Sequence, residues 1–329
     1  MVSHNTAWVK RGMVIRCSRN SFTVQTVDGA SVECHIKGKV LKDSGRFYNP
    51  LAPGDTVNIE EDAGHPETGR VVSLEKRRNI FSRFNAKGQA PQLLAANADA
   101  VLCLTTPESP PFRPRFLDRV LVQAEAAAID AVIVCNKCDL GFEDPAVEER
   151  LEDFTRIGYT VFRVSAKTGE ALDALAAFIS GKTVVLIGQS GTGKSSLINA
   201  LAPGLNIKTG ALNEKYDRGN HTTVMPLMFE LPLGAYTGGG TSVTRIIDTP
   251  GIRLFVPHGI AADDVILYLR EFAPLAGQCS YGLSCSHRAE PGCKIIEALQ
   301  SGLIHEDRYN SFLRISAEIS GSADRNYGD

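Results

Sequence analysis

The chain has 329 residues, of which 43% are apolar and 22% charged, and its formal net charge at pH 7 is −2. At about 100–200 residues per domain this length predicts two or three domains, and the composition excludes a collagen-like or wholly disordered chain. Because the sequence has neither the ~18 consecutive apolar residues of a membrane helix nor the apolar segment of a secretory signal, we expect a soluble, cytoplasmic monomer with no membrane partner.

Residues 10–76 are predicted to form a small β-barrel. Short runs of alternating apolar and polar residues are separated by turn signals such as Asp28-Gly29 and Pro53-Gly54-Asp55. Five such strands are typical of the OB-fold, a barrel that binds oligonucleotides and oligosaccharides. The expected strands are Met13–Cys17, Phe22–Val27, Ser31–Ile36, Thr56–Glu60 and Arg70–Leu74.

This N-terminal region is basic. Residues 1–97 hold 14 Lys and Arg against 9 Asp and Glu, whereas the whole chain is slightly acidic. One loop contributes Lys37, Lys39, Lys42 and Arg46, which either face a polyanion such as RNA or form a solvated loop. Residues 76–97 are expected to be a polar linker, because they begin with Lys76-Arg77-Arg78.

From about residue 98, strands alternate with helices, which predicts a mostly parallel sheet with helices on both faces. The expected strands are Ala98–Leu104, Ala131–Cys135, Thr160–Val164, Thr183–Ile187, Met225–Leu231 and Val243–Ile247, and the helices are Arg115–Ile129, Pro145–Ile157, Ala171–Ile179 and Lys194–Leu201. After about residue 262 we expect helices at Asp263–Glu271, Lys294–Leu299 and His305–Ile319, around a cysteine-rich segment. The predicted domains are therefore an OB-fold at 1–85, an α/β domain at 86–262 and a mostly helical domain at 263–329.

Residues Gly188–Ser195 match the phosphate-loop pattern G-x-x-x-x-G-K-S between an expected strand and an expected helix. Glycines let consecutive backbone N–H groups point at phosphate oxygens, and the helix N-terminus adds a favourable dipole. We expect Lys194 to neutralise the β- and γ-phosphates and assist catalysis, and the Ser195 hydroxyl to bind Mg²⁺. The expected nucleotide-binding residues are Gly188, Gln189, Ser190, Gly191, Thr192, Gly193, Lys194, Ser195 and Ser196.

Two further motifs predict which base is bound. Asn136-Lys137-Cys138-Asp139 and Ser165-Ala166-Lys167 each follow an expected strand, at the sheet edge where α/β proteins bind ligands. The carboxylate of Asp139 can accept hydrogen bonds from N1–H and the 2-amino group of guanine, which adenine lacks, and the Ala166 N–H can donate to the guanine O6. Cys135 and Cys138 also form a C-x-x-C pair, which is an alternative redox or metal motif.

The metal and the γ-phosphate are expected to be bound by a later segment. Asp248-Thr249-Pro250-Gly251 follows another strand, so that Asp248 can hold Mg²⁺ through water and the Gly251 N–H can reach the γ-phosphate. Residues 209–224 are rich in glycine, asparagine and charge, as in a mobile switch, and either Thr222 or Thr223 can reach the metal.

These motifs occur in an unusual order, because the base-reading motifs precede the phosphate loop. A sheet can keep its structure when its chain is cut elsewhere, since termini that lie close together tolerate permutation. In this order the sequence resembles the circularly permuted GTPases that act in maturation of the small ribosomal subunit, over nearly its whole length. The resemblance implies an OB-fold, a permuted GTPase domain and a zinc-binding domain, slow GTP hydrolysis that the small subunit stimulates, and contacts with ribosomal RNA.

The C-terminal cysteines have the spacing of a metal site. Cys279, Cys285, His287 and Cys293 supply three thiolates and an imidazole, which suits one closed, structural Zn²⁺. The first gap holds five residues here and usually four in the family, which affects the shape of the loop more than the ligands.

Slow intrinsic hydrolysis is expected from the residue after the Asp248–Gly251 motif. Many GTPases have a glutamine that orients water there, and this chain has the apolar Ile252. His221 is the nearest candidate for a catalytic group, and it corresponds to the histidine suspected in the family. We therefore predict a GTP hydrolase whose nucleotide state, GTP or GDP, gates docking to the small subunit. The alternatives are a non-catalytic GTP-dependent RNA- or ribosome-binding switch and an OB-fold ATPase.

Overall fold

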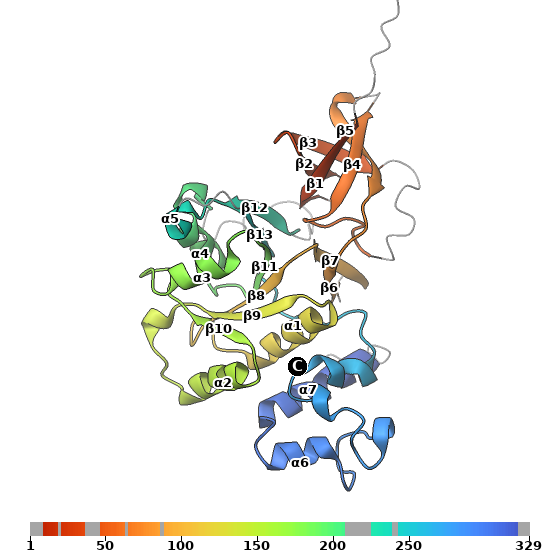
Figure 1. Cartoon of the computed structure of the whole chain (residues 1–329), viewed down its shortest axis with the longest axis vertical. Coiled ribbons are helices and arrows are strands. Elements are labelled where there is room, and N and C mark those ends of the chain that lie inside the picture. The colour runs from red at the N-terminus through yellow and green to blue at the C-terminus, as the bar shows by residue number, and fades with distance from the viewer. Residues whose placement is uncertain are drawn as a thin grey trace, which may run out of the picture.

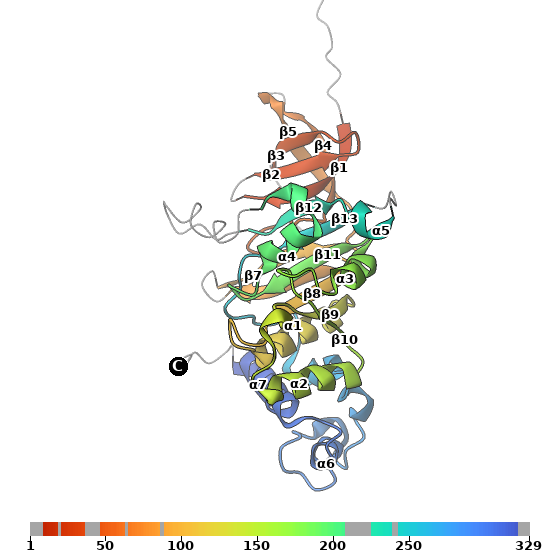
Figure 2. The ribbon, with the colours of Figure 1, turned by 90° about the vertical axis from the view of Figure 1, so that its left-hand side faces the viewer.

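The computed structural model describes residues 9–18, 21–36, 47–62, 65–85, 89–207, 225–238 and 243–321. Three parts follow one another along the long axis of the molecule: a β-barrel at one end, an α/β domain in the middle and a helical part at the other end (Figures 1 and 2). None of the helices in these ranges combines the length and the apolar character needed to cross a lipid bilayer.

The N-terminal barrel closes as the sequence predicts. Its strands are β1 (Val9–Cys17), β2 (Phe22–Thr26), β3 (Ser31–Ile36), β4 (Thr56–Asp62) and β5 (His65–Leu74). Strand β1 pairs with both β2 and β4, β4 pairs with β5, and β3 pairs with β5 in parallel, so no edge is left open. Alternate side chains such as Val14, Val24 and Ile59 fill the interior, which confirms the five-stranded barrel.

The expected polar linker at 76–97 is wrong, because this segment forms a hairpin of β6 (Ile80–Asn85) and β7 (Ala90–Ala96). The basic residues of the segment suggested exposure to solvent, but the segment also contains apolar residues, and of these Phe81 and Leu93 are fully buried. The hairpin is joined to the barrel by Arg77, whose guanidinium donates to both carboxylate oxygens of the buried Asp55 at 2.7 and 2.8 Å.

The middle domain is a six-stranded sheet with the order β10-β9-β8-β11-β13-β12. Five strands are parallel: β8 (Ala100–Thr105), β9 (Asp130–Cys135), β10 (Thr160–Arg163), β11 (Thr183–Gly188) and β13 (Thr244–Asp248). The edge strand β12 (Leu227–Leu231) is antiparallel to β13, and its Leu227 also pairs with Arg16 of the barrel.

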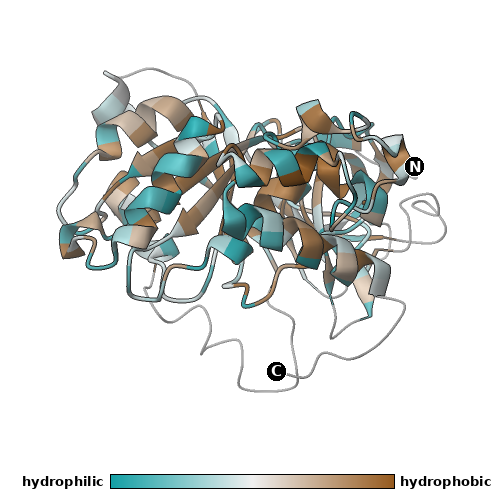
Figure 3. Cartoon of the chain, turned by 90° about the horizontal axis from the view of Figure 1, so that it is seen from below, coloured by the Kyte–Doolittle hydropathy of each residue, from teal (hydrophilic) through white to brown (hydrophobic). Residues whose placement is uncertain are grey.

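Helices cover both faces of this sheet. Side chains alternate between the faces, so that Cys103 and Ile133 contact the core under α1 (Pro114–Ala126) and α2 (Pro145–Arg156). Leu102 and Val134 contact the core under α3 (Leu172–Ile179), α4 (Lys194–Leu201) and α5 (Gly234–Thr237). Figure 3 shows the sheet as apolar and the outer turns of the helices as hydrophilic.

The C-terminal part contains α6 (Lys294–Gln300) and α7 (Glu306–Ser320). The expected helix at 263–271 is instead the 3-10 helix η3 (Ala262–Tyr268). Ala261, the residue before it, offers no side chain that could cap the N-terminus of an α-helix.

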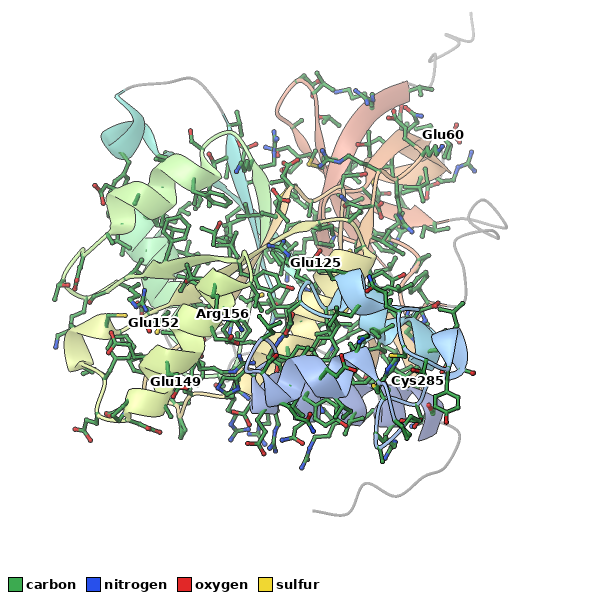
Figure 4. All side chains as sticks on the ribbon, turned by 60° about the horizontal axis from the view of Figure 1, so that its bottom comes forward. Glu60, Glu125, Glu149, Glu152, Arg156 and Cys285 are labelled. Atoms are coloured by element: carbon green, nitrogen blue, oxygen red, sulfur yellow. The ribbon has the colours of Figure 1, made fainter. Side chains whose placement is uncertain are left out.

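This part docks on the α/β domain through apolar and charged contacts. Val122 of α1 lies in the same core as the residues of η3, α6 and α7. Arg270 donates to Glu125 of α1 at 2.6 Å, and Arg156 of α2 donates to the Leu303 carbonyl at 2.9 Å. Figure 4 labels Glu125 and Arg156 on the side of the α/β domain that meets the C-terminal helices.

Candidate nucleotide-binding and metal sites

Four loops meet at the carboxyl ends of neighbouring parallel strands. The loop after β11 leads into α4, and the others follow β9, β10 and β13. Every strand of the parallel sheet points its carboxyl end to this edge, which is where open α/β sheets bind ligands. The order of the motifs along the chain therefore does not matter for their position in space.

The loop after β11 has the geometry of a phosphate loop. Gly191 and Gly193 have φ values of 86° and 89°, which side chains rarely allow, and the loop leads directly into α4 at Lys194. The Lys194 Nζ donates to the carbonyl oxygens of Gly188 and Gln189 at 2.8 and 3.1 Å. Burial lowers the pKa of Lys194, and the charge of Asp248 opposes this effect.

Asn136 joins the base-reading loop to the phosphate loop. Its Nδ2 donates to the Thr192 carbonyl, and its Oδ1 accepts from the Ala166 N–H, both at 3.0 Å. The contact is close, because a Cβ on Gly193 would lie 2.4 Å from the Asn136 Nδ2. One buried side chain thus brings three separate motifs together.

The carboxylate of Asp139 is held by the next loop. Ser165 Oγ donates to Asp139 Oδ1 at 2.7 Å, and Lys167 Nζ lies 3.6 Å from Asp139 Oδ2. The hydrogen bond from Ser165 is the main reason that the pKa of Asp139 is below its usual value, although partial desolvation opposes it. The carboxylate is therefore ionised and oriented at neutral pH, as an acceptor for a guanine edge requires.

A loop that sequence reasoning missed also contributes to this site. The segment between β8 and α1 places the Ser109 carbonyl 2.6 Å from Lys137 Nζ, and Pro110 Cδ would lie 3.5 Å from a Cβ on Gly191. The available signal was the proline-rich run at 107–111, which follows the carboxyl end of a buried strand.

Asp248, the last residue of β13, has an environment that fits a cation. Its Oδ1 is buried and has no hydrogen-bond partner among the described residues. Burial raises its pKa to about 6, and the nearby charge of Lys194 only partly offsets this. A divalent cation beside this oxygen would stabilise the ionised form of the carboxylate. The half-buried Ser195, near the start of α4, adds a hydroxyl oxygen, and oxygen atoms are the ligands that Mg²⁺ prefers.

The segment after Asp248 contacts both the phosphate loop and the hairpin. A Cβ on Gly251 would lie 3.1 Å from the backbone of Ser190, so glycine allows the close approach. Ile252 is buried in the core on one face of the sheet and offers no polar group to a water molecule. Further along, Phe255 stacks on Phe81 of β6 with ring centroids 5.7 Å apart.

The four predicted metal ligands converge in the C-terminal part. The ligand atoms of Cys279, Cys285, His287 and Cys293 all lie within 4.8 Å of one another, and all four residues are buried. His287 Nδ1 is 3.5 Å from the sulfurs of both Cys279 and Cys293. The carboxylate of Glu290 stabilises the intervening loop by accepting from the N–H groups of Ser286, Arg288 and Ala289 at 2.7–3.1 Å. A closed set of three thiols and one imidazole can hold a metal ion.

Comparison with known proteins decides the family. A family model described as RsgA GTPase matches residues 74–256. A protein from Bacteroides fragilis named "Small ribosomal subunit biogenesis GTPase RsgA" is 36% identical over 306 residues, which are 92% of this chain and 95% of that protein. The chain belongs to the RsgA GTPase family.

Solved structures agree with this assignment. YjeQ from Thermotoga maritima is 28% identical, with a TM-score of 0.71 over 95% of this chain and 99% of that chain. YloQ, described as a circularly permuted GTPase, is 22% identical and shares the fold, with a TM-score of 0.65 over 99% of this chain and 100% of that chain. The predicted family of circularly permuted GTPases, the three-part architecture and the GTP hydrolase activity of the RsgA family are thereby confirmed.

Some predicted residues of this RsgA-family chain lie outside the described part. They are the candidate catalytic His221, the switch threonines Thr222 and Thr223, and the basic residues Lys37, Lys39, Lys42 and Arg46. The other predicted nucleotide and metal residues lie in or beside the loops described above, with Lys194, Ser195 and the exposed Ser196 in the first turn of α4.

Proposed function

We propose that this chain is a GTPase of small ribosomal subunit maturation that binds ribosomal RNA and acts as a monomer. Its parts would be the OB-fold at 1–85, the permuted GTPase domain at 86–262 and the zinc-binding domain at 263–329. The observation that carries the proposal is the convergence of three guanine-nucleotide motifs through Asn136. Relatives named for small ribosomal subunit biogenesis cover nearly the whole chain and support the subunit as partner.

In the proposed site Asp139 reads N1–H and the 2-amino group of guanine, while Lys137 packs on the ring. The Ala166 N–H donates to Asn136 Oδ1 in this structure, so its proposed bond to O6 requires that the two acceptors share this donor. The phosphate loop and Lys194 neutralise the phosphates, and the Gly251 N–H meets the γ-phosphate. Ser195 directly and Asp248 through water hold Mg²⁺, which neutralises charge on the transferred group. The buried, unpartnered oxygen of Asp248 supports this assignment. Zn²⁺ is proposed for the Cys₃His cluster, because a complete thiolate and imidazole set is typical of structural zinc.

Slow intrinsic turnover follows from the burial of Ile252. An apolar side chain inside the core cannot orient a water molecule, so another group must supply that help. We propose His221 or a group of the bound subunit. Stimulation of about 10⁵-fold, as partners of other GTPases achieve, would lower the barrier by about 7 kcal/mol.

A route from the γ-phosphate to the docking surfaces supports gating by the nucleotide. The segment after Gly251 contacts β6 at several points, among them the stacked ring of Phe255 and the Phe84 N–H, which donates to the Val256 carbonyl at 2.9 Å. The hairpin in turn contacts the barrel, where the Tyr48 N–H donates to the Pro91 carbonyl at 2.7 Å. A shift of this segment would therefore be transmitted toward the OB-fold.

Arginines beside the phosphate loop support an RNA-facing side. Arg113, Arg115 and Arg253 line a cavity of about 400 Å³ together with Gln189 and Phe112. Within the described ranges these three arginines make no ion pair, and the acidic Asp307 also lines the cavity, so the balance of charge there is positive. If this side meets RNA, neutralising Arg113 and Arg253 should reduce the salt dependence of binding by about one counterion per lost contact.

The deciding experiment is a GTP hydrolysis assay titrated with purified small ribosomal subunits. The expected result is slow release of phosphate by the chain alone and a large increase that saturates with subunits. Large subunits serve as the control. Equal turnover with and without small subunits would overturn the proposed partner, and replacement of His221 by alanine tests its role if GTP affinity is retained.

A further inference from the structure

The C-x-x-C pair within the base-reading loop is a feature that the GTP site does not use. Cys135 is the last residue of β9, and Cys138 is the first residue of the 3-10 helix η1 (Cys138–Leu140). Asn136 and Lys137 lie between them. Two cysteines placed at a strand end and the following helix start have the arrangement of a redox-active dithiol.

The two cysteines are in contact and differ in access. Of the eight cysteines, seven are buried and Cys138 alone is partly exposed. The Cys138 thiol donates to the Cys135 carbonyl at 3.2 Å, which holds it beside the strand end that carries the other cysteine. The interaction between the two side chains holds the pKa of Cys138 below its ordinary value and, together with burial, raises the pKa of Cys135. Cys138 is thus suited to react first with an oxidant, and Cys135 to resolve the product.

We propose that Cys135 and Cys138 form a reversible disulfide that weakens GTP binding. The oxidant is a small-molecule disulfide such as oxidised glutathione. The Cys138 thiolate attacks one of its sulfurs, so that a mixed disulfide forms and one glutathione thiolate leaves. Cys135 then loses its proton to that thiolate and attacks the Cys138 sulfur, which releases the second glutathione. Two thiols are oxidised by two electrons, and one glutathione disulfide is reduced to two glutathione molecules.

The fold explains why this bond acts on the base-reading carboxylate. A disulfide is about 2.05 Å long, much shorter than any non-bonded contact between two sulfur atoms, so one cysteine must move. Cys135 is held on both sides, by Thr105 of β8 and Arg163 of β10, whereas among the described residues the backbone of Cys138 makes one hydrogen bond outside its own turn, from its N–H to the Val164 carbonyl at 3.1 Å. We therefore expect Cys138 to shift and to carry the adjacent Asp139 away from Ser165.

The test measures the affinity of the full-length, zinc-loaded protein for a fluorescent GDP analogue in reduced and oxidised glutathione buffers. The readout for each protein is its own ratio of Kd in oxidising to reducing buffer. We expect a ratio of about ten or more for the natural chain, reversed by dithiothreitol, because the disulfide disturbs the charged hydrogen bonds of Asp139. Cys135→Ser and Cys138→Ser should each give a ratio near one, whereas Cys103→Ser, a buried thiol on the neighbouring strand, should keep the natural ratio.

Peptide mapping under non-reducing conditions and a zinc-release assay complete the test. A Cys135–Cys138 cross-link in the oxidised protein, with zinc retained, supports the proposal. The proposal would be overturned by a persistent mixed disulfide or by the absence of the cross-link. It would also be overturned if Cys138→Ser lost as much affinity on oxidation as the natural chain, because oxidation of the zinc-binding cysteines would then explain the loss. Failure of the reduced protein to bind the analogue would instead contradict the GTP site, and mapping would still decide whether the disulfide forms.

Discussion

Asn136 and Thr192 are joined by a hydrogen bond of 3.0 Å between the side-chain amide of one and the backbone carbonyl of the other. The two residues belong to motifs that are 56 positions apart in the chain. Because the other end of the same amide accepts from Ala166, the loops for base and phosphate form one unit. The proposed recognition of guanine and the position of the phosphates would therefore be coupled through a single side chain.

Replacing Asn136 with alanine should weaken the binding of GTP and GDP equally, by about tenfold or more, because two buried backbone groups lose their partners at about 1–3 kcal/mol each. Affinities can be measured with fluorescent analogues. Asn79→Ala is a matched control, since its side chain makes the equivalent pair of bonds to Ala98, away from the site. A change of less than twofold in Asn136→Ala would contradict the coupling.

Asp139→Asn should change the base preference from guanine to xanthine. An amide can still accept from N1–H, but it repels the 2-amino group of guanine and can donate to the 2-carbonyl of xanthine. A site that pairs with a specific polar group of its ligand can discriminate by ~10⁴ or more against a ligand that lacks this group, so loss of the pairing can remove that discrimination between bases. Competition of GTP and XTP for the same fluorescent analogue measures the switch, and unaltered preference would show that Asp139 does not face the base.

The convergence of the nucleotide motifs was predictable because each motif is a short run placed at the end of a recognisable strand. Asp139 and Lys194 could be assigned to one site before their positions were known, since parallel strands deliver their carboxyl ends to one edge. The cluster of Cys279, Cys285, His287 and Cys293 was predicted by a different signal, their spacing in the sequence.

The contacts between the parts were not predictable, because they depend on pairs that are distant in sequence and have no motif. The hairpin was missed since Arg77 and Arg78 suggested solvent, whereas Arg77 makes an ion pair with the buried Asp55. Ser109 was missed because its contribution to the site is a backbone carbonyl, which any residue could supply.

Asp248→Asn should stabilise the protein in Mg²⁺-free buffer while impairing hydrolysis. Burial raises the pKa of Asp248 from 3.8 to about 6, so the folded state binds the proton more tightly than the unfolded state. The free energy of unfolding in the absence of metal therefore falls as the pH rises from about 4 to 6. Above pH 6 the ionised, buried carboxylate lowers this free energy by on the order of 1–3 kcal/mol.

Thermal unfolding at pH 5 and pH 8 checks this. We expect the Tm of the asparagine variant to be a few degrees above that of the natural chain at pH 8. At pH 5 the difference in Tm should be smaller, because the carboxyl of the natural chain is then mostly protonated. In the presence of GTP, Mg²⁺ should raise the Tm of the natural chain more than that of the variant. A Tm difference that does not depend on pH would contradict the assigned pKa.

Removal of the metal should loosen the C-terminal part and leave the nucleotide site intact. The segment 276–293 has few large buried side chains besides its ligands, so metal-binding energy supplies much of its folding energy. Cys293→Ser or a chelator should increase hydrogen exchange at residues 276–321 and remove the metal, for which we propose one zinc ion per chain, with little change in affinity for GDP. Cys34→Ser, a buried thiol of the barrel, should retain the metal.

Arg308→Met should destabilise the junction between the α/β domain and the C-terminal part. The Arg308 guanidinium is fully buried and donates to Asp118 at 2.9 Å and to Glu271 at 2.5 and 2.8 Å. Methionine fills much of the same volume but leaves Glu271 without its cation and Asp118 with only the longer ion pair to Arg150 at 3.4 Å, and breaking a buried pair in this way costs about 3–5 kcal/mol.

Denaturation in urea measures this cost, with Arg314→Met on the exposed face of α7 as the control that should change the free energy of unfolding by less than about 0.5 kcal/mol. Adding Asp118→Asn and Glu271→Gln to Arg308→Met should recover part of the loss, because it removes the uncompensated charges rather than restoring any contact. If the triple variant is no more stable than Arg308→Met alone, the penalty comes from lost packing around α7, and the ion pairs do not hold the junction together.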